Sequence, residues 1–241
     1  MIYFLYGPDT YRSWQKLSAI KEKYLNTSKG DTDLLMLEGN GLTLTQFKIQ
    51  CQTKPLLSGR RLIIINDLLT NGSRELCQGV ADGLSKLDND NILIFYERGL
   101  PDRRSALFKA LDRPKQAQFF DNLNGPVLWQ QIESMSSQLE AKLSRQAIQY
   151  LASIIGSDLY RLENELQKIA LYQNMDKSPA ITEPALIDIE LINLLVAGLP
   201  ETKIFDLTDA FGQRQGERGQ AILNNLTSEN SDLTYSLLPL L

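Results

Sequence analysis

Five short apolar runs, separated by stretches with helical periodicity, set the strongest constraint on how this chain folds. Each run is continuous rather than alternating, which is typical of strands buried on both faces, as in a parallel sheet. Each run ends at or near Gly, Asn or Asp, residues that favour turns. The five runs cover residues 2–6, 34–37, 62–65, 92–96 and 117–120.

The stretches between these runs carry apolar residues at helical spacing. In the first stretch, Tyr11, Trp14, Leu17 and Ile20 follow the spacing of an amphipathic helix. Alternating strands and helices predict an open α/β fold with right-handed crossovers. The predicted helices cover residues 10–27, 43–52, 73–86 and 103–111.

The hydrophobic period changes after residue 125, and no further strand is evident in the sequence. Short amphipathic helices follow, one capped by Ser144 and a later one capped by Thr182 that carries Leu186 and Ile189. Helices of this kind form a small bundle. We therefore expect an α/β domain at 1–124, a helical domain at 125–199 and the beginning of a third, helical domain at 200–241.

Composition narrows the chemistry that the chain can perform. It has 241 residues, a net charge of −4 and a sequence pI near 5.1, so it carries no general basic field for phosphate backbones. It contains no histidine, which excludes Ser-His-Asp and Cys-His catalysis and His-ligated metals. Cys51 and Cys77 are interpreted as reduced thiols, although counting leaves a disulfide open. The apolar N-terminus is too short for a signal peptide or a membrane span, which predicts a cytoplasmic protein.

The turn after the first apolar run, at Gly7, is where a phosphate-binding loop would lie. That loop needs the pattern G-x-x-x-x-G-K-[ST], because its backbone amides surround the phosphates and its lysine reaches them. The second glycine, the lysine and the Ser/Thr of the pattern fall here on Arg12, Ser13 and Trp14. All three are the wrong residue type, so we predict a degenerate, non-functional P-loop.

Other charged residues near the strand ends are interpreted as structural. Asp9 or Thr10 is expected to cap the helix that follows the degenerate loop. Asp67 resembles the aspartate of a Walker B strand but has no neighbouring glutamate, so we expect it to end its strand. The basic doublets at 60–61 and 103–104 are predicted to be solvated surface of an acidic chain.

The segment 52–59, between a helix and the third apolar run, is unusual. Pro55 stops the helix, and a Ser-Gly pair forms a turn before the next strand. Two adjacent leucines, Leu56 and Leu57, cannot easily both face the sheet from so short a loop. From the residues alone, they either pack under the loop as core or form an exposed apolar pair that binds a partner.

Five stretches of the sequence, taken in order, are similar to one known family. They read GPDTY at 7–11, KPLLSGRRLIII at 54–65, DRRSALFKAL at 102–111, SDLYRLENELQKIALY at 157–172 and IFDLTDAF at 204–211. In this combination the chain resembles the delta subunits of the bacterial DNA polymerase III clamp loader. The resemblance extends over essentially the whole chain.

The resemblance implies an architecture and a function. The fold would be a AAA+/RecA-like parallel-sheet domain with a degenerate P-loop, a helical lid domain and the beginning of a helical collar domain. The family continues the collar through several more helices, so the resemblance implies that it is incomplete here. The protein would bind the ring-shaped sliding clamp and open it for loading on primed DNA during replication, while other subunits hydrolyse ATP.

The same resemblance implies which partners the chain has. The other clamp-loader subunits, gamma or tau and delta-prime, would join it through the collar, and contact with primed DNA would be indirect or weak. The chain would catalyse no reaction itself, although the holoenzyme is a DNA-directed DNA polymerase, a nucleotidyltransferase. No cofactor, metal or membrane is implied.

The clamp-binding element of the family lies just before the third strand, as a glutamine followed by a hydrophobic pair that enters a clamp pocket. Gln52, Leu56 and Leu57 fall on those positions, so the resemblance implies that the leucine pair is exposed. Leu57 departs from the phenylalanine that is common there and offers less apolar area. Three alternatives remain: a nucleotide-binding AAA+ ATPase, a nucleic-acid-binding module, which the pI near 5.1 disfavours, and a delta-prime-like scaffold subunit, whose usual cysteine cluster is absent here.

Overall fold

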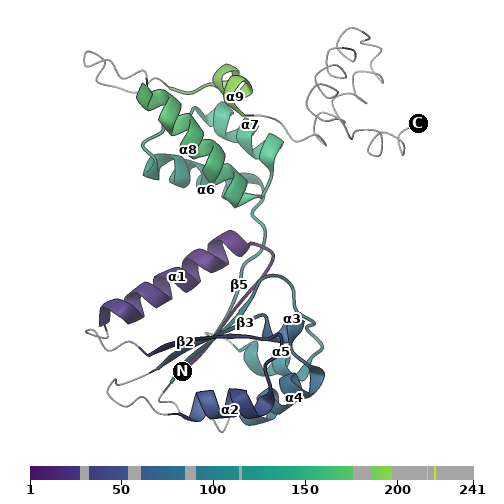
Figure 1. Cartoon of the computed structure of the whole chain (residues 1–241). Helices are drawn as coiled ribbons and strands as arrows, with labels where there is room; N and C mark the ends of the chain where they lie inside the picture. Colours follow the sequence, from purple (N-terminus) through teal and green to yellow (C-terminus); the bar gives the residue numbers. More distant parts are fainter. Residues whose placement is uncertain are drawn as a thin grey trace. The chain divides into compact units, whose positions relative to one another are not determined.

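The chain forms two compact units, which the computed structural model describes separately. The first unit comprises Met1–Asn122 and the second Leu123–Leu241 (Figure 1). The unit boundary lies close to residue 124, where the sequence changes its hydrophobic period. The residues that the structure describes are 1–27, 33–53, 61–84, 91–113, 116–175, 186–196 and the single positions 216 and 220.

A parallel sheet forms the centre of the first unit. Among the described residues its strands lie in the order β2-β3-β4-β1-β5, and every neighbouring pair is parallel. The predicted parallel sheet is therefore confirmed, with each strand bound within one residue of its expected position. The strands are β1 (Ile2–Tyr6), β2 (Leu34–Glu38), β3 (Leu62–Asn66), β4 (Ile92–Glu97) and β5 (Ala117–Phe119).

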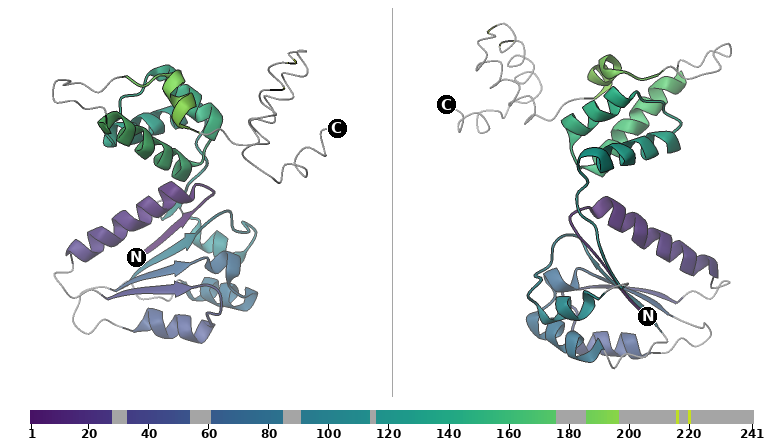
Figure 2. Two further views of the ribbon diagram at one scale, coloured as in Figure 1. Left: turned by 45° about the horizontal axis from the view of Figure 1, so that its top comes forward. Right: turned by 180° about the vertical axis from the view of Figure 1, so that it is seen from behind.

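Helices cover both faces of this sheet. They are α1 (Thr10–Thr27), α2 (Leu44–Gln52), α3 (Leu68–Asn71), α4 (Arg74–Gly83) and α5 (Ala106–Leu111). α1 packs on one face, where Leu17 and Tyr24 are buried beside Ile64 of β3. α2, α4 and α5 pack on the opposite face, and Figure 2 shows them gathered away from α1. All five residues of β3 are buried as a result.

Side-chain caps determine where the shorter helices begin. Thr43, Ser73 and Ser105 each accept a backbone N–H at the start of α2, α4 and α5. Because Ser105 caps α5, that helix begins at Ala106 and not at residue 103, as the sequence had predicted. α3 was not predicted at all, because its four residues are too few to carry a hydrophobic period.

Trp14 of α1 does not lie on the buried face of the helix, where its sequence spacing had placed it. Tyr11 and Leu17 are buried, but the Trp14 side chain is 54% exposed. The buried face instead includes Ser13, Leu17 and Tyr24. Trp14 follows Ser13 by one residue and is therefore rotated by about 100° around the helix. The expectation that Trp14 belongs to the apolar stripe was wrong.

The described part of the second unit is helical. Its helices are α6 (Gly125–Gln138), α7 (Arg145–Ile155), α8 (Leu159–Met175) and α9 (Ile189–Leu195). Their core contains fully buried residues from each helix, including Ile132, Leu151, Leu166 and Ile192. Ser144 caps α7 as expected, with its Oγ 3.1 Å from the backbone nitrogen of Ala147. Helices therefore follow the sheet, as the period change predicted.

The last of these helices begins later than expected. Asp188 caps α9, with its Oδ1 3.1 Å from the backbone nitrogen of Leu191, whereas Thr182 lies outside the described residues. Ile187 forms a parallel bridge with Leu143, which keeps it in an extended conformation before the helix. Leu186 therefore precedes α9 and is 65% exposed, which corrects the prediction that the helix carries it.

The third domain, expected at 200–241, lies outside the described residues except for Gly216 and Gln220. Within the described ranges, no helix combines the length and apolar character that a membrane span requires.

Both cysteines lie in the first unit as free thiols. Burial raises the pKa of the Cys51 thiol to about 12, although Arg61 opposes this shift. Burial also raises the pKa of Cys77, and the charge of Glu97 adds to it.

We expect both cysteines to react slowly with iodoacetamide in the folded chain, because the thiolate is the nucleophile. Cys51, which is 3% exposed, should react more slowly than Cys77. Mass spectrometry of alkylated chain, with and without urea, measures the difference. Rapid modification of native Cys51 at mildly alkaline pH would contradict this burial.

Candidate functional site

The carboxyl ends of parallel strands are where α/β proteins usually bind ligands. Here the turn after β1 approaches its neighbours too closely for a larger residue. Gly7 has φ +139°, and a Cβ built on it would lie 2.1 Å from the carbonyl oxygen of Phe120. Its backbone N–H donates to the Gly99 carbonyl at 2.9 Å. This glycine is therefore required by packing within the protein.

Other amides of the degenerate loop are also used internally. The Asp9 N–H donates to Phe120 at 3.1 Å, and the Arg12 N–H donates to the Asp9 carboxylate at 2.9 Å. Asp9, rather than Thr10, thus supplies the cap that we expected for α1. A buried carboxylate occupies the helix N-terminus, where a P-loop would hold a phosphate.

The three positions that depart from the P-loop pattern have separate structural roles. The Arg12 Nε lies 2.6 Å from the Asp9 Oδ2, and its Nη2 lies 2.6 Å from the Asp121 carbonyl oxygen. Ser13 is fully buried, with its Oγ 3.4 Å from the Tyr96 hydroxyl. Trp14 faces outward from α1. The structure therefore brings Arg12 and Ser13 into the packed unit but leaves Trp14 at its surface.

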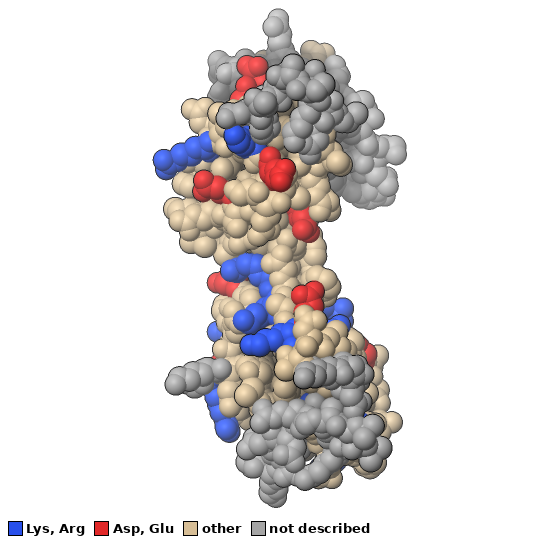
Figure 3. Space-filling model, turned by 90° about the vertical axis from the view of Figure 1, so that its left-hand side faces the viewer, with Lys and Arg blue, Asp and Glu red and all other residues tan. Residues whose placement is uncertain are grey.

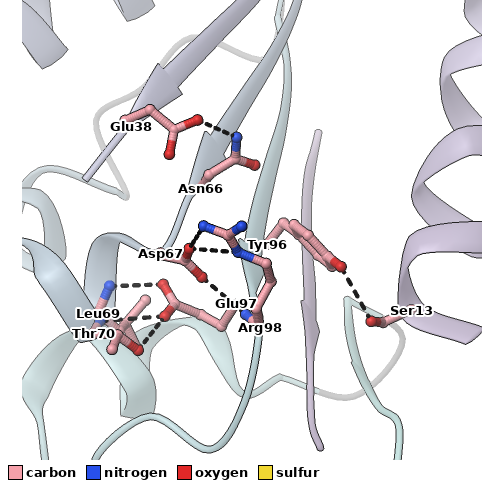
Figure 4. A network of polar contacts seen from close by, with 9 residues as sticks. All are labelled: Ser13, Glu38, Asn66, Asp67, Leu69, Thr70, Tyr96, Glu97 and Arg98. Atoms are coloured by element: carbon pink, nitrogen blue, oxygen red, sulfur yellow. Dashed lines mark hydrogen bonds and ion pairs between the residues drawn. The ribbon is translucent and has the colours of Figure 1, made fainter. Parts of the chain in front are cut away.

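The aspartate at the Walker B position forms an ion pair. Asp67 follows β3 directly, as expected, and adopts a left-handed conformation with φ 49°. Its carboxylate accepts the Arg98 backbone N–H at 2.9 Å and the Arg98 Nε at 2.8 Å, and it also contacts Nη2 (Figure 4). Asp67 is buried, so this pair neutralises a carboxylate that faces the end of the sheet.

A second carboxylate from β4 holds the short helix α3. Glu97 is fully buried, and its Oε1 lies 2.7 Å from the Leu69 nitrogen. Its Oε2 accepts the Thr70 N–H at 3.2 Å and the Thr70 hydroxyl at 2.7 Å (Figure 4). Burial raises the Glu97 pKa, because these hydrogen bonds do not fully compensate for lost hydration.

These partners of Asp67 and α3 could not be identified from the sequence. Arg98 and Glu97 are ordinary charged residues after an apolar run, and only the β3–β4 register brings them to Asp67 and α3. Asn66 also joins this edge, donating from Nδ2 to the Glu38 carboxylate at 2.7 Å. The carboxylates at this edge that could act as catalytic acids or bases instead bind cations, amides or hydroxyls of the same unit.

Arg60 lies outside the described residues, and the other three arginines of the basic doublets have different environments. Arg61 was predicted to be solvated, but its side chain is 15% exposed and its Nε lies 2.6 Å from the Asp33 Oδ2. Arg103 lies over the Phe119 ring, 5.4 Å from its centroid. Arg104 is a solvated surface residue, as predicted, paired with Asp102. Figure 3 shows Lys and Arg interspersed with Asp and Glu on the face it draws, without a continuous basic field.

Of the predicted clamp-binding residues, the structure places only Gln52, which lies at the other edge of the sheet. Gln52 ends α2, is exposed, and precedes β3 along the chain. Leu56 and Leu57 lie outside the described residues. Because all the strands are parallel, the start of β3 and the degenerate loop after β1 are at opposite edges.

Replacing Gly7 with alanine should destabilise the fold more than replacing Gly99. Both glycines have positive φ, +139° and +148°, but nothing lies within 4 Å of a Cβ at Gly99. Gly99→Ala should cost about 1–3 kcal/mol from backbone strain, and Gly7→Ala should cost more because of Phe120. Urea denaturation of both variants measures this, and equal losses would mean that the close approach is unimportant.

Wild-type stability should fall relative to Glu97→Gln as pH rises above the ordinary glutamate pKa of about 4.3. In that range the unfolded carboxyl ionises while the buried one keeps its proton, so ionisation lowers the free energy of the unfolded state relative to the folded state. The difference should become constant once the pH exceeds the raised pKa. Urea denaturation of both proteins across this range measures it, and a difference independent of pH would show that the Glu97 pKa is not raised.

Comparison with known proteins gives one family match within the first unit and one relative that aligns with nearly the whole chain. Residues 3–121 match the family described as DNA polymerase III, delta subunit. Over 242 aligned residues, the chain is 22% identical to DNA polymerase III subunit delta of Bacillus subtilis (strain 168). That alignment covers 96% of this chain and 67% of the relative.

Solved structures show the same fold. The Bacillus subtilis DNA clamp loader delta protein superimposes with a TM-score of 0.63 at 20% identity, covering 95% of this chain and 68% of that one. The Thermotoga maritima RuvB Holliday junction branch migration motor gives a TM-score of 0.52 at 13% identity, covering 89% and 69%. The expected AAA+-like architecture is thus confirmed. Residues 3–121 thus match the delta subunit family, and nearly the whole chain is homologous to a clamp-loader delta subunit of DNA polymerase III.

Proposed function

We propose that this chain binds the sliding clamp through segment 52–57 and opens one interface of the ring. The match of residues 3–121 to the delta subunit family is the observation that carries the proposal, and the position of Gln52 supports it. Gln52 is exposed at the end of α2, at a sheet edge separate from the degenerate P-loop. In this proposal Gln52, Leu56 and Leu57 contact the clamp.

The leucine pair would supply much of the binding free energy. Burying two leucines contributes roughly 3–6 kcal/mol before the costs of association are subtracted. Affinity for a pocket alone does not open a ring, because a ligand shifts an equilibrium only by its differential affinity for the two states. The chain must therefore bind the open clamp interface better than the closed one.

Other subunits would hydrolyse ATP and so supply the free energy for loading. Asp9 occupies the helix N-terminus after β1, and Arg98 pairs with the aspartate at the Walker B position. These contacts support a non-catalytic role beside nucleotide-hydrolysing subunits of the gamma or tau type. The third domain would provide the collar that joins them and delta-prime, and primed DNA would be contacted weakly or indirectly.

Replacing both Leu56 and Leu57 with alanine should reduce clamp affinity by about 100-fold or more, because central apolar contacts dominate interfaces. Calorimetric titration of this chain into the sliding clamp of the same organism, without nucleotide, measures the loss. The far-ultraviolet circular dichroism and urea midpoint of the variant should remain those of the wild type.

A matched control replaces two exposed leucines of the second unit, Leu186 and Leu194, with alanine. They are 65% and 74% exposed, so this change removes similar apolar area elsewhere. Its clamp affinity should be unchanged. Unchanged affinity in the folded Leu56/Leu57 variant would reject the site, and no binding by folded wild-type chain would favour a scaffold role like that of delta-prime.

A further inference from the structure

Three residues at the starts of neighbouring strands form a connected group, here called the anchoring cluster: Asp33, Arg61 and Asn91. They directly precede β2, β3 and β4. Backbone hydrogen bonds link them, since Leu62 donates to Asp33 at 3.0 Å and Ile92 donates to Arg61 at 2.8 Å. The cluster therefore lies at the edge of the sheet where α2 ends.

Arg61 connects two elements at this edge. Its Nε lies 2.6 Å from the Asp33 Oδ2, and its Nη1 makes a longer contact of 3.4 Å with the Gln50 carbonyl oxygen. Gln50 is in the last turn of α2, where carbonyl groups lack partners within the helix and favour a nearby cation. One guanidinium thus links the end of α2 to the start of β2.

Asn91 holds the next carbonyl of the same helix turn. Its Nδ2 donates to the Cys51 carbonyl at 2.7 Å, and the residue is 4% exposed. Thr53 completes the arrangement, since its N–H and hydroxyl both donate to the Ile49 carbonyl, at 3.0 and 2.6 Å. Three consecutive carbonyls at the end of α2 are therefore bound, two of them by Arg61 and Asn91, which directly precede β3 and β4.

The hydrogen bonds of the anchoring cluster have a consequence for the segment between Thr53 and Arg61. α2 ends on one side of that segment, Arg61 begins β3 on the other, and the cluster bonds the two sides together. We propose that Asp33, Arg61 and Asn91 are positioning residues for clamp binding: they fix both ends of the segment that carries Leu56 and Leu57. This inference rests on the proposed function, and its physical basis is preorganisation, which lowers the ordering cost of binding.

The first experiment measures the anchor without the clamp. Amide hydrogen exchange of peptides covering 49–53 should accelerate in Arg61→Gln, Asp33→Asn and Asn91→Ala. Arg104→Gln is the matched control, because Arg104 pairs with Asp102 in the same unit but lies on the exposed loop before α5. That control should leave exchange at 49–53 unchanged. Equal exchange in all variants would overturn the inference.

The second experiment measures clamp affinity by calorimetry. Arg61→Gln and Asp33→Asn should each weaken binding by about tenfold, while Arg104→Gln should have no effect. Asp33→Asn distinguishes positioning from direct contact, because it leaves the Arg61 charge in place. A loss in Arg61→Gln without one in Asp33→Asn would mean that Arg61 touches the clamp itself, which overturns the positioning role.

A double-mutant cycle with Leu57→Ala tests whether the cluster acts through the leucine pair. Positioning predicts that Arg61→Gln weakens binding much less in the Leu57→Ala background than in the wild type. Additive losses would overturn the inference. Failure of the proposed function is distinguished from failure of this inference by the wild-type chain. If the proposed function is wrong, folded wild-type chain does not bind the clamp, whatever the rate of hydrogen exchange at 49–53.

Discussion

The first unit depends on a sheet that is buried on both of its faces. Every residue of β3 is inaccessible, because α1 covers one face and α2, α4 and α5 cover the other. With the faces closed, polar groups can gather only at the two edges where strands begin and end. This constraint separates the unit into a carboxyl edge, where the loop after β1 lies, and an amino edge, where Gln52 and Arg61 lie.

The two edges use charge in different ways. At the carboxyl edge, each acid is held by groups of the same unit: Asp9 by Arg12, Asp67 by Arg98, and Glu97 by the start of α3. These contacts bind the turns after β1 and β3 and the start of α3 to neighbouring groups of the unit. At the amino edge, Arg61 links backbone elements on either side of a loop. Both edges are thus arranged for rigidity.

Much of the fold could be predicted from the sequence, because continuous apolar runs and helical periods are local signals. The strands follow those runs to within one residue. The partners of Asp67 and Arg61 could not be predicted, since they depend on strand register and on a helix end distant in sequence. The start of α9 was misplaced because Thr182 and Asp188 are both good caps, and the bridge at Ile187 decides between them. The assignment of Leu56 and Leu57 to the clamp remains a prediction from family resemblance.

The carboxylate of Asp9 has a consequence for how this loop could change during evolution. Restoring the missing glycine and lysine would not by itself restore a phosphate site, because a buried negative charge already satisfies the start of α1. Removing Asp9 alone would take away the ion-pair partner of Arg12 and the cap of the helix. A phosphate site at this loop would therefore require replacement of Asp9 together with Arg12, Ser13 and Trp14.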